Sequence, residues 1–170
     1  MANTYIASYD FGTSGVKAVI FDCDKDKVIA SCNAGYPLIS PHPGWAEQNC
    51  DDYWDAVCIA TKEAVKKAGV DKKDIKGVVF GTQGMGVIPI DENDNVLYNN
   101  ITWLDGRAGK QAQKINEILG VEATSDKDVW PKFAWIKENL PDVYKRQGHI
   151  DRWQYSPDCS DRLIETVFQK

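Results

Sequence analysis

The start of the chain contains three short β-prone runs, and the connections between them are too short for neighbouring strands to run parallel. A parallel pair needs a crossover of about a dozen residues or more, whereas the connections here are the turns Gly12–Gly15 and Asp22–Lys27. The β-prone runs themselves are Tyr5–Tyr9, Val16–Phe21 and Val28–Cys32. The sequence therefore predicts an antiparallel meander near the N-terminus.

A change of period from Asp51 onward predicts an amphipathic helix that ends before Gly69, a residue suited to the C′ position. The run Val78–Phe80 is apolar throughout, which is typical of a central strand. Another strand is predicted at Val87–Ile90. Strand, helix and strand in this order indicate an α/β fold with a mixed sheet and flanking helices.

The later part of the chain predicts smaller elements. Ile101–Trp103 is expected to form a further strand, and Gly109–Leu119 a helix with Ile115, Ile118 and Leu119 on its inner face. A second helix is expected at Pro131–Asn139, where proline occupies a tolerated first-turn position. Beyond Val143 no clear apolar period remains.

Composition excludes several classes of function. The 170 residues are 43% hydrophobic with a formal net charge of −5, enough for one sizeable core but opposed to a nucleic-acid partner, which needs a basic face. No apolar stretch approaches the roughly 18 residues of a membrane span, and the start lacks a secretory pattern, so a cytoplasmic protein is expected. The cysteines are scattered without a CxxC pair, which predicts reduced thiols and no zinc site.

The turn between the first two runs carries the clearest chemical signal. Glycines let the backbone approach an anion closely, while backbone N–H groups and hydroxyls donate to phosphate oxygens. A carboxylate at the strand end suits Mg²⁺, held through water. The segment is neither a P-loop nor a GxGxxG motif, so an ordinary hairpin stays the alternative. The residues expected to bind the cofactor are Asp10, Gly12, Thr13, Ser14, Gly15 and Lys17, with Asp10 at the metal.

Five stretches together resemble the FGGY family of carbohydrate kinases, xylulose kinases above all. Asp10 to Lys17 is similar to the family's opening pattern D-x-G-T-[ST]-x-x-[KR]. The other four resemble P-G-W-x-E-Q followed by W, G-Q-M-H-G followed by D, W-x-D-x-R and P-K-L-x-W-x-K. In this chain they read Pro43–Gln48 with Trp54, Gly81–Gly86 with Asp91, Trp103–Arg107 and Pro131–Lys137. The likeness extends from Tyr5 to Tyr144.

This resemblance implies a ribonuclease H-like fold of the actin/Hsp70/hexokinase superfamily, with ATP and Mg²⁺ as cofactors and a small-molecule sugar as substrate. It places Gln83, Gly84 and Met85 at the sugar. Gly84-Met85 stands where xylulose kinases carry Met-His and glycerol kinases Arg-Glu. A glycerol kinase would therefore lack its main polyol clamp, and a xylulose kinase one of its hydrogen-bonding groups. A pentulose such as xylulose is the expected substrate. Asp105 and Arg107 are expected either to reach the sugar pocket or to pair with each other as scaffold.

The resemblance further implies that residues 1–144 form an incomplete N-terminal kinase domain and that residues 145–170 are divergent or non-native. The family's catalytic Asp is expected beyond position 170, so no catalytic residue is assigned here and the chain alone is expected to be inactive. A homodimer of the longer enzyme stays open. Two alternatives remain: a non-catalytic nucleotide- or sugar-binding module, and another actin/Hsp70-like ATPase.

Overall fold

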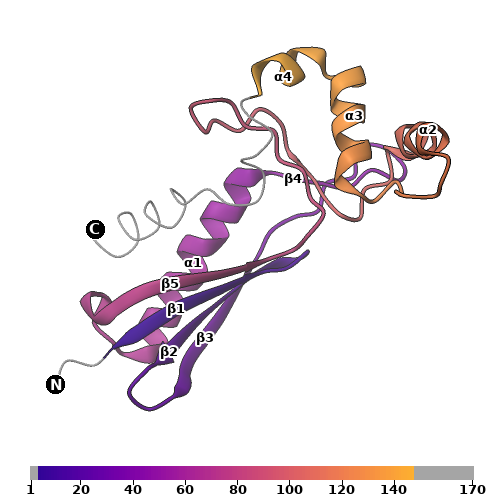
Figure 1. The fold of residues 1–170 in the computed structure, drawn as a ribbon. Coiled ribbons are helices and arrows are strands. Elements are labelled where there is room, and N and C mark those ends of the chain that lie inside the picture. Colours follow the sequence, from indigo (N-terminus) through magenta and orange to yellow (C-terminus); the bar gives the residue numbers. More distant parts are fainter. Residues whose placement is uncertain (1–3, 148–170) are drawn as a thin grey trace. The chain divides into compact units, whose positions relative to one another are not determined.

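A computed structural model describes residues 4–147 of the chain. The described residues divide into two compact units, the first formed by 4–36 and 51–83 and the second by 37–50 and 84–147. In chain order the elements are β1 (Tyr5–Phe11), β2 (Gly15–Asp22), β3 (Lys27–Gly35), β4 (Glu47–Gln48), α1 (Cys50–Ala68), a 3-10 helix (Lys72–Asp74), β5 (Ile75–Thr82), β6 (Asn100–Ile101), α2 (Gly109–Leu119), α3 (Val129–Asn139) and α4 (Pro141–Arg146) (Figure 1).

The predicted meander and mixed sheet are confirmed in the first unit. The sheet has the order β3-β2-β1-β5, in which β1 pairs antiparallel with β2 and parallel with β5. Alternate residues of β1 and β2 are buried, because successive side chains of a strand point to opposite faces. The meander thus offers one apolar face to a helix.

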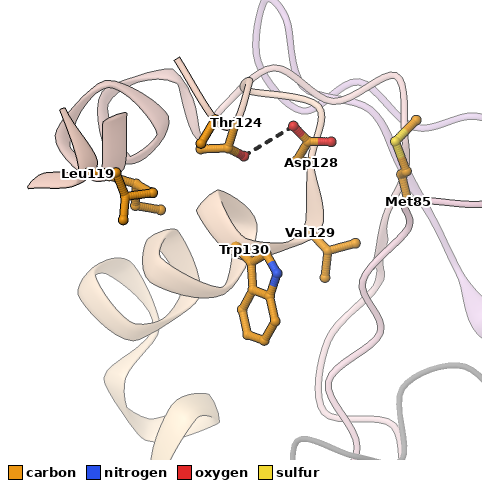
Figure 2. Close-up of a pocket in the computed structure, with 8 residues that line it drawn as sticks. Met85, Leu119, Thr124, Asp128, Val129 and Trp130 are labelled. Carbon is orange, nitrogen blue, oxygen red and sulfur yellow. Dashed lines mark hydrogen bonds between the residues drawn. The ribbon is translucent and has the colours of Figure 1, made fainter. Parts of the chain in front are cut away.

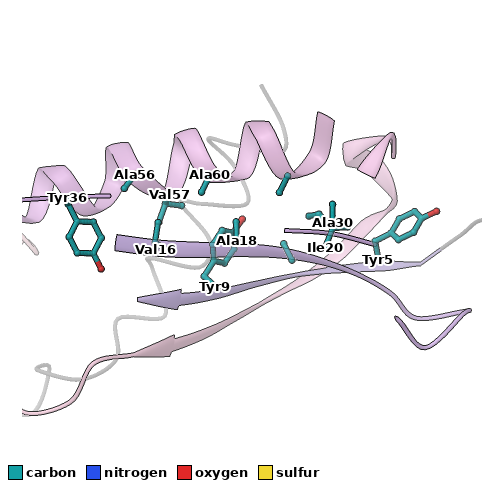
Figure 3. Close-up of a cluster of buried hydrophobic side chains, with 12 residues drawn as sticks. Tyr5, Tyr9, Val16, Ala18, Ile20, Ala30, Tyr36, Ala56, Val57 and Ala60 are labelled. Atoms are coloured by element: carbon teal, nitrogen blue, oxygen red, sulfur yellow. The ribbon is translucent and has the colours of Figure 1, made fainter. Parts of the chain in front are cut away.

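Helix α1 covers that face, as Figure 3 shows. Its small buried residues, Ala56, Ala60 and Ala64, allow close approach to strand side chains such as Ile20. The hydroxyl of Tyr9 lies 3.0 Å from Oγ1 of Thr61, which satisfies both polar groups inside the core.

The ends of α1 follow its charges and its terminal glycine. Asp51 and Asp52 lie in the first turn and Lys66 and Lys67 in the last, as the helix dipole favours. Gly69 adopts φ 65° and its N–H donates to the carbonyl of Val65, so the predicted C′ glycine is confirmed.

The second unit contains α2, α3, α4 and the two-stranded sheet β4-β6. Its apolar core consists of Val87, Ile101, Ala108, Trp135 and Ile136. Helix α2 has the predicted bounds, and α3 begins two residues before the predicted Pro131. Helix α4 continues past the domain boundary expected after residue 144, while most of the tail expected at 145–170 lies outside the described residues.

Two strand predictions need correction. Val87–Ile90 forms isolated bridges instead of a strand, since Pro89 has no N–H to extend a ladder. The strand expected at Ile101–Trp103 is Asn100–Ile101, because Thr102 turns its N–H to the carbonyl of Ala46.

Two burial predictions also need correction. β5 lies at an edge of the sheet within residues 4–147 and is not central, and its Val79 is 54% exposed. On α2 the predicted inner residues Ile118 and Leu119 are exposed, because this helix buries its first half through Gln111 and Ala112. An apolar residue need not be buried. The apolar run Val78–Phe80 and the apolar positions near the end of α2 were therefore wrong guides to burial.

Gly15 is required by close packing. A Cβ atom added there would lie 2.5 Å from the carbonyl oxygen of Ala34 on β3, whereas one added at Gly12 would meet nothing closer than 3.5 Å. Neither glycine has a positive φ, so the difference is one of space.

We therefore expect Gly15→Ala to destabilise the meander by about 1–3 kcal/mol, because β2 and β3 must separate to admit the methyl group. Gly12→Ala is the matched control and should cost clearly less. Amide hydrogen exchange of β1–β3 measures both effects, and equal losses in the two variants would contradict the packing argument.

Candidate functional site

In the first unit, the expected phosphate-binding turn is a tight hairpin between β1 and β2. Its closing contact is the N–H of Gly12 donating to the carbonyl of Gly15 at 3.0 Å, which leaves Thr13 and Ser14 as the loop. Asp10 on β1 lies directly opposite Lys17 on β2 in the strand register, so both side chains share the sheet face opposite α1. Both are exposed and accessible to a ligand.

Tyr36 holds this turn from the buried side of the sheet through hydrogen bonds, a role that the sequence did not reveal. Its buried hydroxyl contacts the carbonyl oxygens of Gly12 and Gly15 at 2.5 and 3.1 Å, and its N–H donates to the carbonyl of Ser14. Burial, and secondarily the charge of Asp10, raises the pKa of Tyr36 to about 12, so it stays a neutral donor. The sequence around Tyr36 indicates this role only weakly, through Gly35, the preceding residue, which ends β3.

The donor set of the turn fits Mg-nucleotide phosphates. Mg²⁺ is commonly bound through one or two carboxylates together with water and substrate phosphates, and the exposed Asp10 supplies one carboxylate. Within residues 4–147 no cluster of three or more ligating side chains is present, so a cage made by protein alone is not the arrangement found there.

Gln83 belongs to the first unit, where it lies beside the end of β1, whereas its sequence neighbours Gly84 and Met85 belong to the second unit. It follows β5, and its N–H donates to the carbonyl of Phe11 at the end of β1, at 2.8 Å. Parallel pairing of β1 with β5 creates this contact.

Met85 occupies an unusual backbone conformation in the second unit. Its φ is 58°, a left-handed value that is uncommon outside glycine, and its side chain is 44% exposed. At the neighbouring Gly86, an added Cβ would lie 2.7 Å from Oδ1 of Asn100, so the Asn100 side chain would have to move to admit it. Gly84, in contrast, has open space around it.

Met85 also lines a cavity of about 570 Å³ in the second unit, part of which Figure 2 draws. The walls are largely apolar, and Thr124 and Asp128 supply polar atoms, with Thr124 donating to Asp128 at 3.1 Å. The remaining lining residues are Ile115, Leu119, Ala123, Val129 and Trp130.

Asp105 and Arg107 form a buried ion-pair network with Glu47. Nη2 of Arg107 lies 2.7 Å from a carboxylate oxygen of each acid, and Nε donates to Asp105 at 2.9 Å. Asp105 also accepts from the N–H of Ala46, and Glu47 from the hydroxyl of Tyr98. The side chains of Arg107 and Asp105 are fully buried, so in this structure they pair with each other.

Two tryptophans enclose the guanidinium of Arg107. Its central carbon lies 3.8 Å from the ring centre of Trp45 and 4.8 Å from that of Trp135. Burial alone would lower the pKa of Arg107, but the hydrogen bonds to Asp105 and Glu47 outweigh it and raise the pKa above its usual value. The cation is therefore permanent, and Trp45 is part of the core.

Lys132 is a second buried cation that the sequence did not assign to the site, although it belongs to the Pro131–Lys137 motif. Its ammonium donates to the carbonyls of Met85 and Lys127 at 2.8 and 2.6 Å. The carbonyl of Met85, one of the expected sugar residues, is thus held by a residue 47 positions away.

Comparison with known proteins finds relatives that match most of this chain. The profile of the FGGY family of carbohydrate kinases, N-terminal domain, matches residues 5–154. A xylulose kinase from Bacillus subtilis is 32% identical over 149 residues, and a glycerol kinase from Thermococcus gammatolerans is 28% identical over 149 residues; each alignment covers 84% of this chain and 30% of the relative. The crystal structure of a gluconate kinase from Lactobacillus acidophilus superimposes with a TM-score of 0.74 at 26% identity, covering 85% of this chain and 30% of that one.

The mixed sheet and its covering helix are those of the actin/Hsp70/hexokinase-like class of α/β proteins. Within that class, this chain belongs to the FGGY family of carbohydrate kinases. It spans about 30% of the length of the curated relatives it matches. In the part of the chain that the structure describes, no helix is long and apolar enough to cross a membrane.

We expect Arg107→Leu to destabilise the second unit by about 3–5 kcal/mol, because Asp105 and Glu47 would be left as buried carboxylates without their cation. Denaturant unfolding followed by tryptophan fluorescence measures this, since Trp45 and Trp135 pack on the guanidinium. Lys114→Ala is the control: it breaks an exposed 3.9 Å pair with Glu138 and should cost at most about 1 kcal/mol. Similar losses in both variants would contradict a structural role for the buried network.

Tyr36→Phe is expected to loosen the Gly12–Gly15 turn, with a cost of about 1 kcal/mol for the lost hydroxyl. Amide exchange at Thr13, Ser14 and Gly15 should accelerate. Tyr9→Phe removes another hydroxyl from the same core, at Thr61, and should leave exchange in the turn unchanged. Unchanged exchange in Tyr36→Phe would show that Tyr36 does not hold the turn.

Proposed function

We propose that this chain supplies the phosphate-binding turn and sugar contacts of an ATP-dependent carbohydrate kinase that phosphorylates a sugar hydroxyl. The observation that carries the proposal is the Gly12–Gly15 hairpin, which places an exposed carboxylate, hydroxyls and a lysine around backbone that can approach phosphate. Membership of the FGGY family supports this reading.

In this proposal the turn binds and orients the nucleotide. Asp10 would hold Mg²⁺, the N–H groups and hydroxyls of Thr13 and Ser14 would donate to phosphate oxygens, and Lys17 would neutralise charge. When bound, Mg-ATP supplies the phosphoryl group that is transferred. Tyr36 contributes by keeping the turn carbonyls directed inward, away from the anion.

For the sugar, we propose contacts from Gln83, Gly84 and Met85. A pentulose such as xylulose is the favoured substrate, since Gly84-Met85 lacks the Arg-Glu pair that the resemblance associates with glycerol. Complete burial of Asp105 and Arg107 favours a supporting role in which they hold the neighbouring segment, including Trp103, in place. The relatives include xylulose, glycerol and gluconate kinases, so the substrate needs a direct test.

The test is ATP-dependent phosphorylation of D-xylulose, D-gluconate and glycerol by the longer enzyme expected to carry this chain. Asp10→Ala should reduce turnover about 100-fold or more, the order of loss seen when one preorganised electrostatic contact is removed. The matched control is Asp26→Asn, an exposed carboxylate at φ 51° in the β2–β3 turn, where Asn tolerates the conformation.

Activity that survives Asp10→Ala would remove the proposed role of the turn. If neither protein nor variant phosphorylates any sugar of the panel, while the chain still binds nucleotide or sugar, the non-catalytic binding module becomes the better reading. The 170-residue chain assayed alone should show no turnover.

A further inference from the structure

Lys132 is a buried cation that is held by backbone carbonyls. Its side chain is completely buried on α3, and within residues 4–147 no carboxylate oxygen lies at ion-pairing distance from its ammonium. Both of its hydrogen bonds go to backbone carbonyls, those of Met85 and Lys127. A buried ammonium is costly unless its N–H groups donate hydrogen bonds. The positions of the two carbonyls and of the lysine are therefore strongly coupled.

The hydrogen bond from Lys132 reaches Met85, whose backbone adopts an unfavourable left-handed conformation. A non-glycine residue at φ 58° needs surrounding contacts that hold it there. The carbonyl of Met85 accepts the Lys132 bond, and Gly86 just after it is confined by the side chain of Asn100. These contacts fix the backbone on the C-terminal side of Met85.

The same lysine is linked to the Trp103–Arg107 segment. Lys127, whose carbonyl accepts from Lys132, donates its own ammonium to the carbonyl of Leu104 at 2.7 Å. A Cβ at Gly106 would lie only 3.1 Å from that ammonium, so the segment approaches closely. Through two lysines, the residues around Met85 and those around Asp105 share one set of hydrogen bonds.

We propose that Lys132 is a positioning residue for sugar recognition: its buried ammonium fixes the carbonyl of Met85 and thereby the left-handed turn that presents the Met85 side chain to the cavity. This rests on the proposed function in one respect, the contact between Met85 and sugar. The hold of Lys132 on Met85 is independent of it.

The charge state of Lys132 controls the strength of this hold. Burial lowers the pKa of Lys132 to about 8; the carboxylates of Asp105, Asp128 and Asp126 oppose that shift, and the charge of Lys127 adds to it. A neutral amine is a weaker donor than an ammonium. The bond to Met85 is therefore strongest below pH 8 and weakens above it.

The sequence allows one atom of this contact to be observed alone. Met85-Gly86 is the only Met-Gly pair in the chain. A sample labelled with carbonyl-¹³C methionine and ¹⁵N glycine therefore gives a single HNCO cross-peak, from the carbonyl that accepts the Lys132 bond. We expect its ¹³C shift to titrate with a midpoint near pH 8.

Lys132→Arg is the decisive variant, because it keeps a buried donor that stays charged across this range. Its cross-peak should not move between pH 6.5 and 9. Lys114→Arg, on the exposed face of α2, should leave the wild-type titration unchanged. A wild-type cross-peak that is constant with pH, or one that titrates equally in Lys132→Arg, would overturn the proposal. Should Lys132→Arg not fold, the wild-type titration alone still decides.

A sugar titration of the same cross-peak separates this proposal from the proposed function. With D-xylulose, D-gluconate or glycerol as probe, the sugar that shifts the peak should bind about fivefold more weakly at pH 9 than at pH 6.5, and equally at both in Lys132→Arg. Affinity independent of pH in the wild type would refute the positioning role. A pH titration near 8 without any response to sugar would instead support the hold and count against Met85 as a sugar contact.

Discussion

The guanidinium of Arg107 is buried, and the second unit is arranged around the need to pair it. Two carboxylates, those of Asp105 and Glu47, accept hydrogen bonds from it, and Trp45 and Trp135 cover its faces. Glu47 and Arg107 are 60 positions apart in the sequence, and Trp45 and Trp135 are farther apart still. A charge withdrawn from water must be paired and hydrogen-bonded. This single requirement brings together the Pro43–Gln48 segment, the Trp103–Arg107 segment and α3.

The first unit satisfies a different constraint, the packing of an antiparallel meander against a helix. Alanines on α1 and alternate strand residues allow the two layers to approach, and Gly15 lets β3 pass within contact of the β1–β2 turn. Tyr36 then binds the turn carbonyls from the buried side. The exposed groups of the turn, Asp10 and Lys17, are left on the opposite face for a ligand. The same backbone geometry that completes the core thus prepares the proposed phosphate site.

Both units place backbone carbonyls under the control of a buried side chain. Tyr36 acts on Gly12 and Gly15, and Lys132 acts on Met85. In each case the residue that holds the carbonyl is buried and distant in sequence from the residue that it holds. Preorganised sites commonly need such support. Lys132 differs in that its charge can change near neutral pH, which makes its hold adjustable.

The sequence by itself determined the meander, the bounds of α1 and α2, the family and the local turn around Asp10, because turn length, helical period and short motifs are properties of neighbouring residues. Only the tertiary structure decided which faces are buried, as Ile118 and Val79 show, and that Asp105 and Arg107 pair in the interior. It also revealed Tyr36 and Lys132, whose partners lie 24 and 47 residues away. Contacts at such separations depend on how elements pack, and no local pattern encodes the partner.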